Sequence, residues 1–342
     1  MFINDAPVRL ICTAVKQYVC HMSVHNNFIQ RRSAGIGPKG ERNLNLKCME
    51  PKDFRDPCPV ELKNAFPQQE GPYATRYPLV FVHGLFMRDD PGGCWGCIPH
   101  FLRCGGAAVF FGGQDAVGSI ETNALQLKQR ICSILEQTGA KKVNLIAHSK
   151  GGLDARYMIS NLNMHASVAS LTTIATPHRG TEAAAIPLRW PWMLRGLTVS
   201  FLNRWFRSMG DASPNVYAAL TELTPDFCKR FNRHVPNHPE VSYQSYGCRM
   251  SCAGSDWRLF LPYALILRKS RDNDGLVSPE SAAWAYYKGL VTGSVKGVSH
   301  WNAIDWHWGD ICGKRRERMP KKLPGVACFY SRLVKELKAA GF

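Results

Sequence analysis

Long hydrophobic runs are missing from this sequence of 342 residues. No stretch of about 18 consecutive apolar residues occurs, so the sequence predicts no membrane-spanning helix. There is no repeat at solenoid or propeller spacing, no heptad run and no glycine at every third position, which excludes repeat arrays, coiled coils and collagen. Hydrophobic residues nevertheless make up 45% of the chain, enough for a sizeable core, and this excludes a wholly disordered protein.

Acidic residues are few in comparison with basic ones. The chain has 26 Asp and Glu against 43 Lys and Arg, a formal net charge of +17. Such an excess is typical of proteins that contact nucleic acid or anionic lipid, or of a well-solvated surface. No zinc finger or other nucleic-acid motif accompanies it, so we expect no nucleic-acid partner. The densest basic run, residues 314–322, indicates either a solvated loop or transient contact with an anionic lipid surface.

The first twenty residues lack the continuous apolar segment and small-residue cleavage site of a secretory signal. Thirteen cysteines are present, an odd number, so at least one thiol is unpaired within the chain. Cys94 and Cys97 form a C-x-x-C, but no second pair follows at zinc spacing. Reduced, buried thiols are therefore expected, and with them a cytoplasmic location.

Two regions differ in character. Residues 1–70 are rich in turn and linker residues and predict an irregular N-terminal extension. Residues 71–342 predict one domain in which buried strands alternate with helices, an α/β fold with a mostly parallel sheet covered on both faces. The expected strands are 79–82, 107–111, 143–147, 168–176, 263–267 and 290–295, and the expected helices follow Ser119 up to Gly139 and run from Leu153 to about Leu162.

The alternation breaks between about residues 181 and 239. This insertion is rich in tryptophan, methionine and phenylalanine at irregular spacing. It predicts either a helical insertion with a buried face or, as we favour from its flanks, a helical cap whose apolar side covers a site.

The strongest chemical signal is Ala147-His148-Ser149-Lys150-Gly151-Gly152, placed after a strand and before a helix. It is close to the G-x-S-x-G nucleophile elbow, in which a serine stands on a tight strand-to-helix turn. The positions two before and two after the serine must be small for the backbones to pass. Here they are Ala147 and Gly151, and Ser149 becomes the candidate nucleophile.

A serine hydroxyl needs a base, which is usually a histidine oriented by a carboxylate in the order Ser, Asp or Glu, His. Asp274, before Gly275, and His300 each follow an expected late strand and are the candidates for these roles. Asp272 remains a competing acid. The competing histidines are His307, His238 and His234, none of them in as good a strand-end context.

The tetrahedral intermediate of acyl transfer needs backbone N–H donors for its oxyanion. One is expected from Lys150, directly after the nucleophile at a helix N-terminus. The other is expected from Leu85 in His83-Gly84-Leu85, in the loop after the first strand. The side chains of His83 and His148 are expected to orient and pack rather than to catalyse.

Together these residues resemble the bacterial true lipases, a triacylglycerol lipase family of the α/β-hydrolase superfamily. The likeness runs from about Tyr77 to Asp305 and includes Ala175 to Gly180. It implies an α/β-hydrolase fold with a helical cap and hydrolysis of carboxylic esters, typically triacylglycerol, through an acyl-serine. By motif position it implies Ser149, Asp274 and His300 as triad, with Leu85 and Lys150 as oxyanion donors.

The resemblance implies no cofactor, and calcium is the one metal it brings into question. Many such lipases hold a structural calcium beside the catalytic histidine, with an Asp two residues after it. That position is Asn302 here, which offers an oxygen but no charge, and Asp305 is the nearby acid that would compensate.

Other functions fit the same residues. An esterase, a thioesterase or a polyester depolymerase would use the same triad on another substrate. A non-catalytic hydrolase-fold protein that binds lipid through its basic face is the alternative from another class. The sequence does not determine the oligomeric state.

Overall fold

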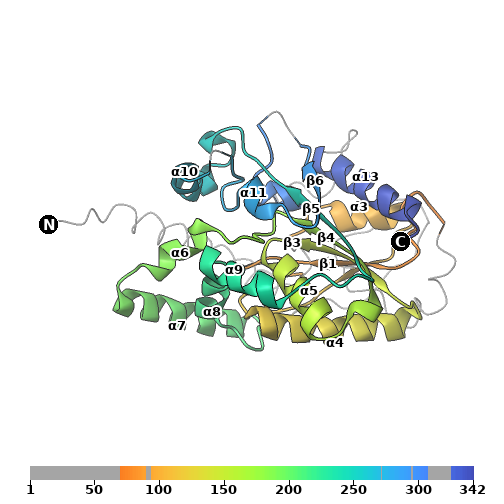
Figure 1. Ribbon diagram of the computed structural model, residues 1–342, viewed down its shortest axis with the longest axis horizontal. Helices are drawn as coiled ribbons and strands as arrows, with labels where there is room; N and C mark the ends of the chain where they lie inside the picture. Colours follow the sequence, from red (N-terminus) through yellow and green to blue (C-terminus); the bar gives the residue numbers. More distant parts are fainter. Residues whose placement is uncertain (1–69, 90–93, 271, 294–295, 307–324) are drawn as a thin grey trace, which may run out of the picture. The chain divides into compact units, whose positions relative to one another are not determined.

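Six parallel strands form one sheet at the centre of the molecule (Figure 1). The structure is a computed structural model that describes residues 70–89, 94–270, 272–293, 296–306 and 325–342. The strand order is β2-β1-β3-β4-β5-β6, and every neighbouring pair is parallel. The strands are β1 (Leu79–Val82), β2 (Val109–Phe111), β3 (Val143–His148), β4 (Val168–Ile174), β5 (Ser242–Gly247) and β6 (Tyr286–Leu290).

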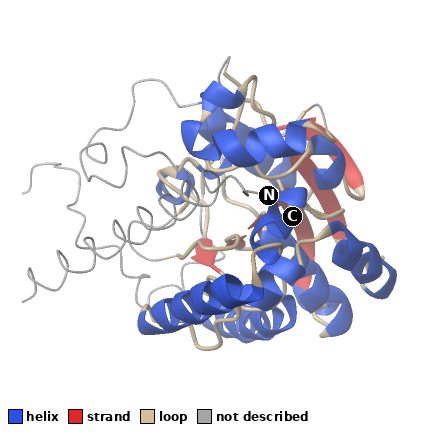
Figure 2. Cartoon of the chain, turned by 90° about the vertical axis from the view of Figure 1, so that its left-hand side faces the viewer, coloured by secondary structure: helices blue, strands red, loops and turns tan. Residues whose placement is uncertain are grey.

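Helices cover both faces of this sheet. Figure 1 places α3 and α13 over one face and α4 and α5 over the other, and Figure 2 shows the same layers from the side. The α-helices are α3 (Ile98–Cys104), α4 (Ile120–Thr138), α5 (Lys150–Asn161), α6 (Glu182–Leu188), α7 (Trp192–Ser208), α8 (Val216–Thr221), α9 (Pro225–His234), α10 (Phe260–Leu267), α11 (Pro279–Ala282) and α13 (Gly325–Ala339). Short 3₁₀ helices are η3 (His165–Ser167), η4 (Ala253–Ser255), η5 (Trp257–Leu259) and η6 (Asn302–Ile304). The expected α/β fold with a parallel sheet between helical layers is confirmed.

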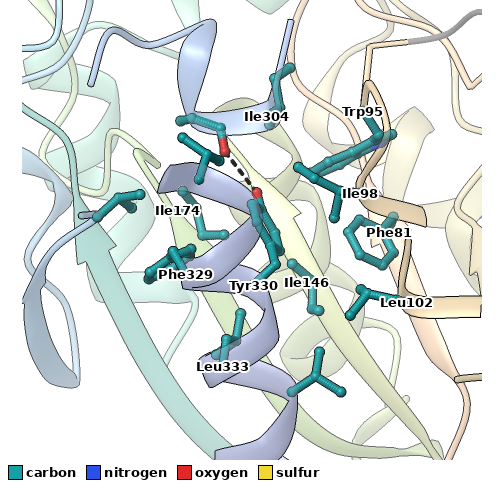
Figure 3. Packing of buried hydrophobic residues seen from close by; sticks show 14 of the residues in the cluster. Phe81, Trp95, Ile98, Leu102, Ile146, Ile174, Ile304, Phe329, Tyr330 and Leu333 are labelled. Carbon is teal, nitrogen blue, oxygen red and sulfur yellow. Dashed lines mark hydrogen bonds between the residues drawn. The ribbon is translucent and has the colours of Figure 1, made fainter. Parts of the chain in front are cut away.

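The core lies in two layers, one on each face of the sheet. Alternate strand residues divide between them, since successive side chains of a strand point to opposite faces. Phe81 packs with α3 and α13 (Figure 3), whereas Val80 and Val82 pack with α4 and α5. Tyr330, fully buried on α13, donates a hydrogen bond of 2.9 Å to the carbonyl of Ala303. The C-terminal helix is thereby tied to the loop that follows His300.

Strands and helices with clear local signals form where the sequence predicts them. Strand β1 occupies 79–82, and β3 and β4 lie within one or two residues of their expected bounds. Helix α4 begins after Ser119, whose hydroxyl accepts from the N–H of Thr122, and ends at Gly139 in the left-handed conformation. A side-chain cap at the start and a glycine at the end are therefore both used as expected.

Two of the expected late strands are wrong. The run from Tyr263 to Leu267 belongs to the helix α10, which packs against α6 and not in the sheet. A short apolar run is compatible with a buried helix as well as a strand, and periodicity does not separate them. The last strand is Tyr286–Leu290 instead of 290–295, so the chain leaves the sheet where that prediction began.

Strand β5 was not predicted. Its sequence, Ser-Tyr-Gln-Ser-Tyr-Gly, is polar, and its first residue is exposed while only its last three are buried. Lying next to the edge strand β6, it is held by pairing on both sides more than by an apolar pattern. Strand assignment there depends on neighbours that the local sequence does not contain.

The insertion after β4 consists of four helices, α6 to α9, over residues 182–234. Figure 1 shows them gathered beside one end of the sheet. None of the helices within the described ranges has the length and apolar character needed to cross a membrane. The extension expected for 1–70 (apart from Glu70), the basic run at 314–322 and His307 lie outside the described residues.

Candidate active site

Ser149 stands between β3 and α5 on the turn that the sequence predicts. Its φ of 52° and ψ of −131° are unusual for a residue with a side chain. Its N–H donates to the carbonyl of Ile174 at 3.0 Å, which ties the turn to β4. A strained conformation of this kind persists only when the surroundings hold it. Here two parallel strands and a helix N-terminus do so.

Small residues around this turn are required by close backbone approach. A Cβ on Gly151 would lie 2.4 Å from the carbonyl oxygen of His83, a contact that backbone atoms do not allow. A Cβ on Gly84 would lie 2.8 Å from the Cβ of Ser149. The loop after β1 is thus pressed against the candidate nucleophile, as the elbow pattern predicts.

Asp274 and His300 complete a hydrogen-bonded chain that ends on Ser149. The Ser149 Oγ lies 2.9 Å from His300 Nε2, and His300 Nδ1 lies 2.8 Å from Asp274 Oδ2. The other oxygen of Asp274 accepts from the N–H groups of Leu276 and Val277 at 2.9 and 2.8 Å. All three side chains are buried. The structure therefore brings together the three residues that the sequence placed in these roles.

The competing residues that the structure describes, Asp272, His234 and His238, lie elsewhere. Asp272 is half exposed and forms an ion pair with Arg249 at 3.2 Å, so it faces solvent instead of His300. His234 is exposed at the end of α9, where its Nδ1 donates to the carbonyl of Arg230. His238 stacks on His165 with ring centroids 3.7 Å apart, before β5 begins. Of the two candidate aspartates, Asp274 is the one whose carboxylate is hydrogen-bonded to the His300 ring.

His148 packs beneath the site as a neutral ring. Burial is the main cause that holds the pKa of His148 well below its ordinary value, and the nearby His300 lowers it further. Its Nε2–H donates to the carbonyl of His300 at 3.0 Å, and the two rings lie 4.6 Å apart. It fixes the backbone of His300, in agreement with the expected packing role.

Of the two expected oxyanion donors, Lys150 directly follows Ser149, and Leu85 follows Gly84, whose backbone closely approaches the Ser149 side chain. Lys150 is the first residue of α5, and the first N–H groups of a helix have no partner within the helix. The N–H of Leu85 has no hydrogen-bond acceptor within the described part of the chain, although the next two N–H groups are bonded to Ala116 and Gly84. Both groups are therefore available to an oxyanion.

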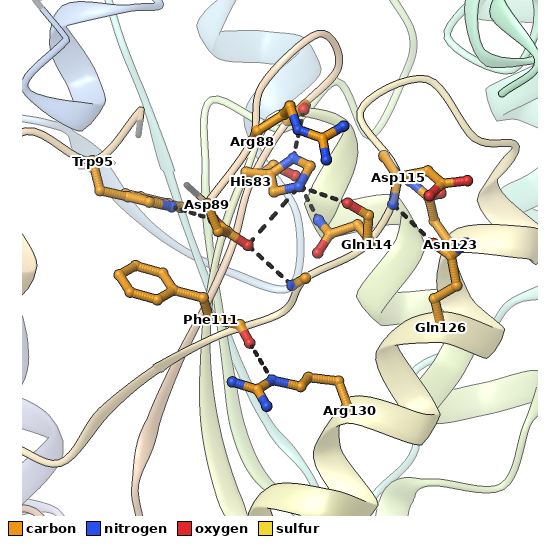
Figure 4. Close-up of polar contacts among 12 residues, drawn as sticks. His83, Arg88, Asp89, Trp95, Phe111, Gln114, Asp115, Asn123, Gln126 and Arg130 are labelled. Atoms are coloured by element: carbon orange, nitrogen blue, oxygen red, sulfur yellow. Dashed lines mark hydrogen bonds and ion pairs between the residues drawn. The ribbon is translucent and has the colours of Figure 1, made fainter. Parts of the chain in front are cut away.

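A polar network that the sequence did not reveal supports the loop after β1 (Figure 4). Gln114 donates from Nε2 to the carbonyl of His83 at 3.0 Å, and a ring nitrogen of His83 lies 2.9 Å from the Gln114 carbonyl. Arg88 forms an ion pair with the buried Asp211 just after α7. The oxyanion loop is thus tied to the insertion. No local pattern marks these residues, because the partners are 31 and 123 positions apart.

Charged residues after the nucleophile hold α5 in place. Lys150 and Asp154 form an ion pair of 2.7 Å with both side chains 1% exposed. Arg156 is stacked on Trp284 at 3.9 Å and donates to the carbonyl of Val235 at 2.9 Å. Its guanidinium also lies 3.2 Å from His178 Nδ1. The contacts of Arg156 thus join α5 to the residue that follows α9, the last helix of the insertion.

Glu222 gives the protein a pH-dependent stability. Desolvation raises its pKa from 4.5 to about 7, with Lys150 opposing the shift, and its Oε2 accepts from the N–H of Ile120. A folded-state pKa above the unfolded one means that stability is lost as pH rises through this range. We expect Glu222→Gln, which still accepts that hydrogen bond, to be more stable than the wild type by about 1–3 kcal/mol near pH 8, and the difference to vanish at about pH 4, below the unfolded pKa.

Thermal unfolding followed at several pH values measures this difference. Glu240→Gln, a change at an exposed carboxylate, is the matched control and should follow the wild type at every pH. Parallel curves for wild type and Glu222→Gln would contradict the assignment.

Within the described ranges, the residues beside His300 do not form a calcium site. Calcium takes six to eight oxygen ligands, several of them carboxylates. Asp305 Oδ2 instead accepts from the N–H of Cys97 at 2.9 Å. Neither Asp305 nor Asn302 belongs to a group of three His, Cys or acidic side chains close enough to share an ion among the described residues. The one such group, His165, His238 and Glu240, lies by the amino ends of β4 and β5 and is rich in nitrogen ligands.

Comparison with known proteins finds lipases. The chain is 31% identical to a triacylglycerol lipase of Pseudomonas fragi over 303 residues, 78% of this chain and 98% of that one. It is 34% identical to triacylglycerol lipase 2 of Saccharomyces cerevisiae, over 62% of each chain. Identity with a Vibrio cholerae triacylglycerol lipase is 43%, over 53% of this chain and 63% of that one. The alignment thus spans less than two thirds of the yeast and Vibrio proteins.

Solved structures agree on the fold. A Staphylococcus hyicus lipase superposes with a TM-score of 0.59 at 18% identity, over 78% of this chain and 97% of that one. A Bacillus licheniformis lipase in its mature form gives a TM-score of 0.51 at 24% identity, over 67% and 86%. Residues 107–215 match the family described as palmitoyl protein thioesterase. Because nearly the whole Pseudomonas fragi enzyme aligns with a chain that has the same kind of fold, this protein belongs to the triacylglycerol lipase family of the α/β hydrolases.

Proposed function

We propose that this protein hydrolyses carboxylic esters through an acyl-serine intermediate. The single observation that carries the proposal is the buried chain of hydrogen bonds from Ser149 through His300 to Asp274. A serine hydroxyl is activated when a base removes its proton, and the base must be held in one tautomer. Asp274 accepts from Nδ1 of His300, so Nε2 is left to accept the proton of Ser149.

The reaction follows from this arrangement. Ser149 Oγ attacks the acyl carbonyl while His300 takes the hydroxyl proton, and the N–H groups of Leu85 and Lys150 stabilise the oxyanion. Collapse breaks the ester bond, and His300 returns the proton to the leaving alcohol. A water molecule then attacks the acyl-serine with His300 as base. The products are a carboxylic acid, an alcohol and the original enzyme.

The exposed surface of the insertion favours a lipid substrate. On α7, Trp192, Met193, Leu197 and Phe201 are each more than half exposed. Large apolar side chains gathered on one helix of a soluble domain mark a binding surface. The same helix carries three arginines and no acidic residue. We infer that α7 contacts the surface of an acylglycerol or anionic lipid phase, in keeping with the net charge of the chain.

Thioesters are a second candidate substrate class. The match of residues 107–215 to the palmitoyl protein thioesterase family favours it, since this range contains Ser149 and the start of the insertion. The acyl-serine chemistry is the same, and only the leaving group differs.

A substrate panel tests these proposals. We expect turnover of p-nitrophenyl esters and of emulsified triacylglycerol, with lower activity on a palmitoyl thioester. We expect Leu197→Ser with Phe201→Ser to lower activity on the emulsion about 10-fold, because two apolar contacts with lipid are lost, and to leave a soluble short-chain ester unaffected. Leu125→Ser, a change at another exposed leucine, which lies on α4, is the control.

Each outcome of the panel is informative. Faster turnover of the thioester than of any ester would assign the protein to the second class. Equal loss on soluble and emulsified esters would contradict the role of α7. Lipid binding without any turnover would leave the non-catalytic alternative from the sequence as the correct one.

A further inference from the structure

Asp256 and Arg258 form a buried ion pair beside the loop that carries His300. The guanidinium of Arg258 donates from Nε and from one terminal nitrogen to the two carboxylate oxygens of Asp256, both at 2.8 Å. The side chain of Arg258 is 10% exposed and that of Asp256 is 4% exposed. Two parallel hydrogen bonds of this kind fix orientation as well as charge, which a lysine would not reproduce.

This pair is bonded to the residues on both sides of His300. Ser299 donates from Oγ to Asp256 Oδ2 at 2.9 Å, and the same hydroxyl accepts from the N–H of Asn302 at 3.1 Å. On the other side, the guanidinium lies over the ring of Trp301 at 4.5 Å and over that of Trp306 at 5.5 Å. A charged planar group against two aromatic faces is a stabilising contact. His300 therefore sits between two anchored neighbours.

The position of Asp256 and Arg258 in the fold makes this contact a non-local one. They lie at the start of η5, and Ser299 is 43 residues further along the chain. The hydrogen bonds of the His300 imidazole go to Asp274 and Ser149, and not to the pair of Asp256 and Arg258. Its effect on the imidazole passes through the backbone of residues 299–301.

We propose that Arg258 is a positioning residue that holds His300 in the geometry needed for proton transfer, acting through Asp256, Ser299 and Trp301. The guanidinium of Arg258 supplies the positive charge beside this loop. Asn302 and Asp305 do not form a metal site there, so the side chain takes the role that a bound metal ion would have. The proposal rests on the ester hydrolysis proposed above. A small displacement of a catalytic base is costly, because misplacement by about 1 Å lowers a rate by as much as about 10²-fold.

The test compares Arg258→Ala with the wild type on a soluble short-chain ester. We expect kcat to fall by about 10²-fold while KM stays within about twofold, since substrate binding groups are untouched. Methylguanidinium at millimolar concentration should restore several-fold of the lost kcat by occupying the space left beside Asp256, whereas methylammonium, which lacks the fork, should not. Arg258→Lys should recover little activity for the same reason.

Arg249→Ala is the matched control. Arg249 also pairs with an aspartate, Asp272, but both side chains are about half exposed. Its loss should leave kcat unchanged, as expected for an exposed ion pair. The wild type should also keep full activity in EDTA, because the cation of the loop is part of the chain.

Ser299→Ala provides a second route if Arg258→Ala does not fold. It removes one hydroxyl from the chain of contacts and should lower kcat without changing KM. If both residues act through one network, the double variant should be no slower than Arg258→Ala alone.

Several results would overturn the proposal. One is full kcat in folded Arg258→Ala and Ser299→Ala. Another is a loss of activity that tracks the unfolded fraction and is not restored by methylguanidinium. Inactivation of the wild type by EDTA would show that a metal supplies the cation. Failure of ester hydrolysis itself would appear as an inactive wild type that does not react with a fluorophosphonate, an outcome distinct from all of these.

Discussion

We expect Ser149→Ala to abolish ester hydrolysis and to leave the fold intact. We expect kcat to fall by about 10⁴- to 10⁶-fold, because removal of a triad nucleophile leaves only the contribution of binding and the oxyanion donors. The change deletes one oxygen and keeps the Cβ, so the turn between β3 and α5 keeps its packing. The N–H of Ser149, which bonds to Ile174, is unaffected by the substitution.

Initial rates on a p-nitrophenyl ester, with circular dichroism as the check on folding, measure this loss. Labelling by a fluorophosphonate provides an independent readout. The wild type should be labelled once per chain and the variant not at all. A folded variant that keeps even a tenth of the activity, or that is still labelled, would place the nucleophile elsewhere.

Asp274→Asn has the second largest effect. An asparagine at this position keeps the size of the side chain but offers an N–H₂ where the carboxylate accepts from His300 Nδ1. The histidine is then held in the wrong tautomer, with Nε2 protonated and unable to take the proton of Ser149. We expect kcat to fall by about 10³- to 10⁴-fold with KM little changed.

Asp272→Asn is the matched control for this prediction. It makes the same chemical change two residues away, at a half-exposed carboxylate paired with Arg249. The control should retain wild-type kcat in the assay that shows the loss in Asp274→Asn. If instead Asp272→Asn is the slow variant and Asp274→Asn is not, the carboxylate of the triad has been assigned to the wrong residue.

The elements around Ser149 could be predicted because their signals are local. Strands β1 and β3 are short buried runs, and Ser119 and Gly139 mark the ends of α4 by capping. The elbow could be recognised because steric demand restricts the residues next to the serine, as the close approach of Gly151 to His83 shows. In each case the residues that carry the signal lie within a few positions of one another in the chain.

The second half of the domain was harder to predict. The apolar run in α10 has no period that separates strand from helix, and β5 is polar because its pairing partners supply the stability. The length of such a segment and the Gly and Pro residues that flank it do not by themselves separate a strand from a helix. Those errors did not affect the site, since Asp274 and His300 lie in loops whose turn residues were clear.

By itself, the sequence determined the kind of chemistry, since a serine between small residues, a later acid and a later histidine specify nucleophilic catalysis wherever they meet. Only the tertiary structure showed that Asp274, which the sequence favoured over the competing Asp272, meets His300, because the two lie two residues apart and one is buried while the other is half exposed. It also decided that α7 exposes its apolar side chains and that Arg258 lies beside the His300 loop. These depend on contacts between distant parts of the chain, which packing creates and local sequence does not encode.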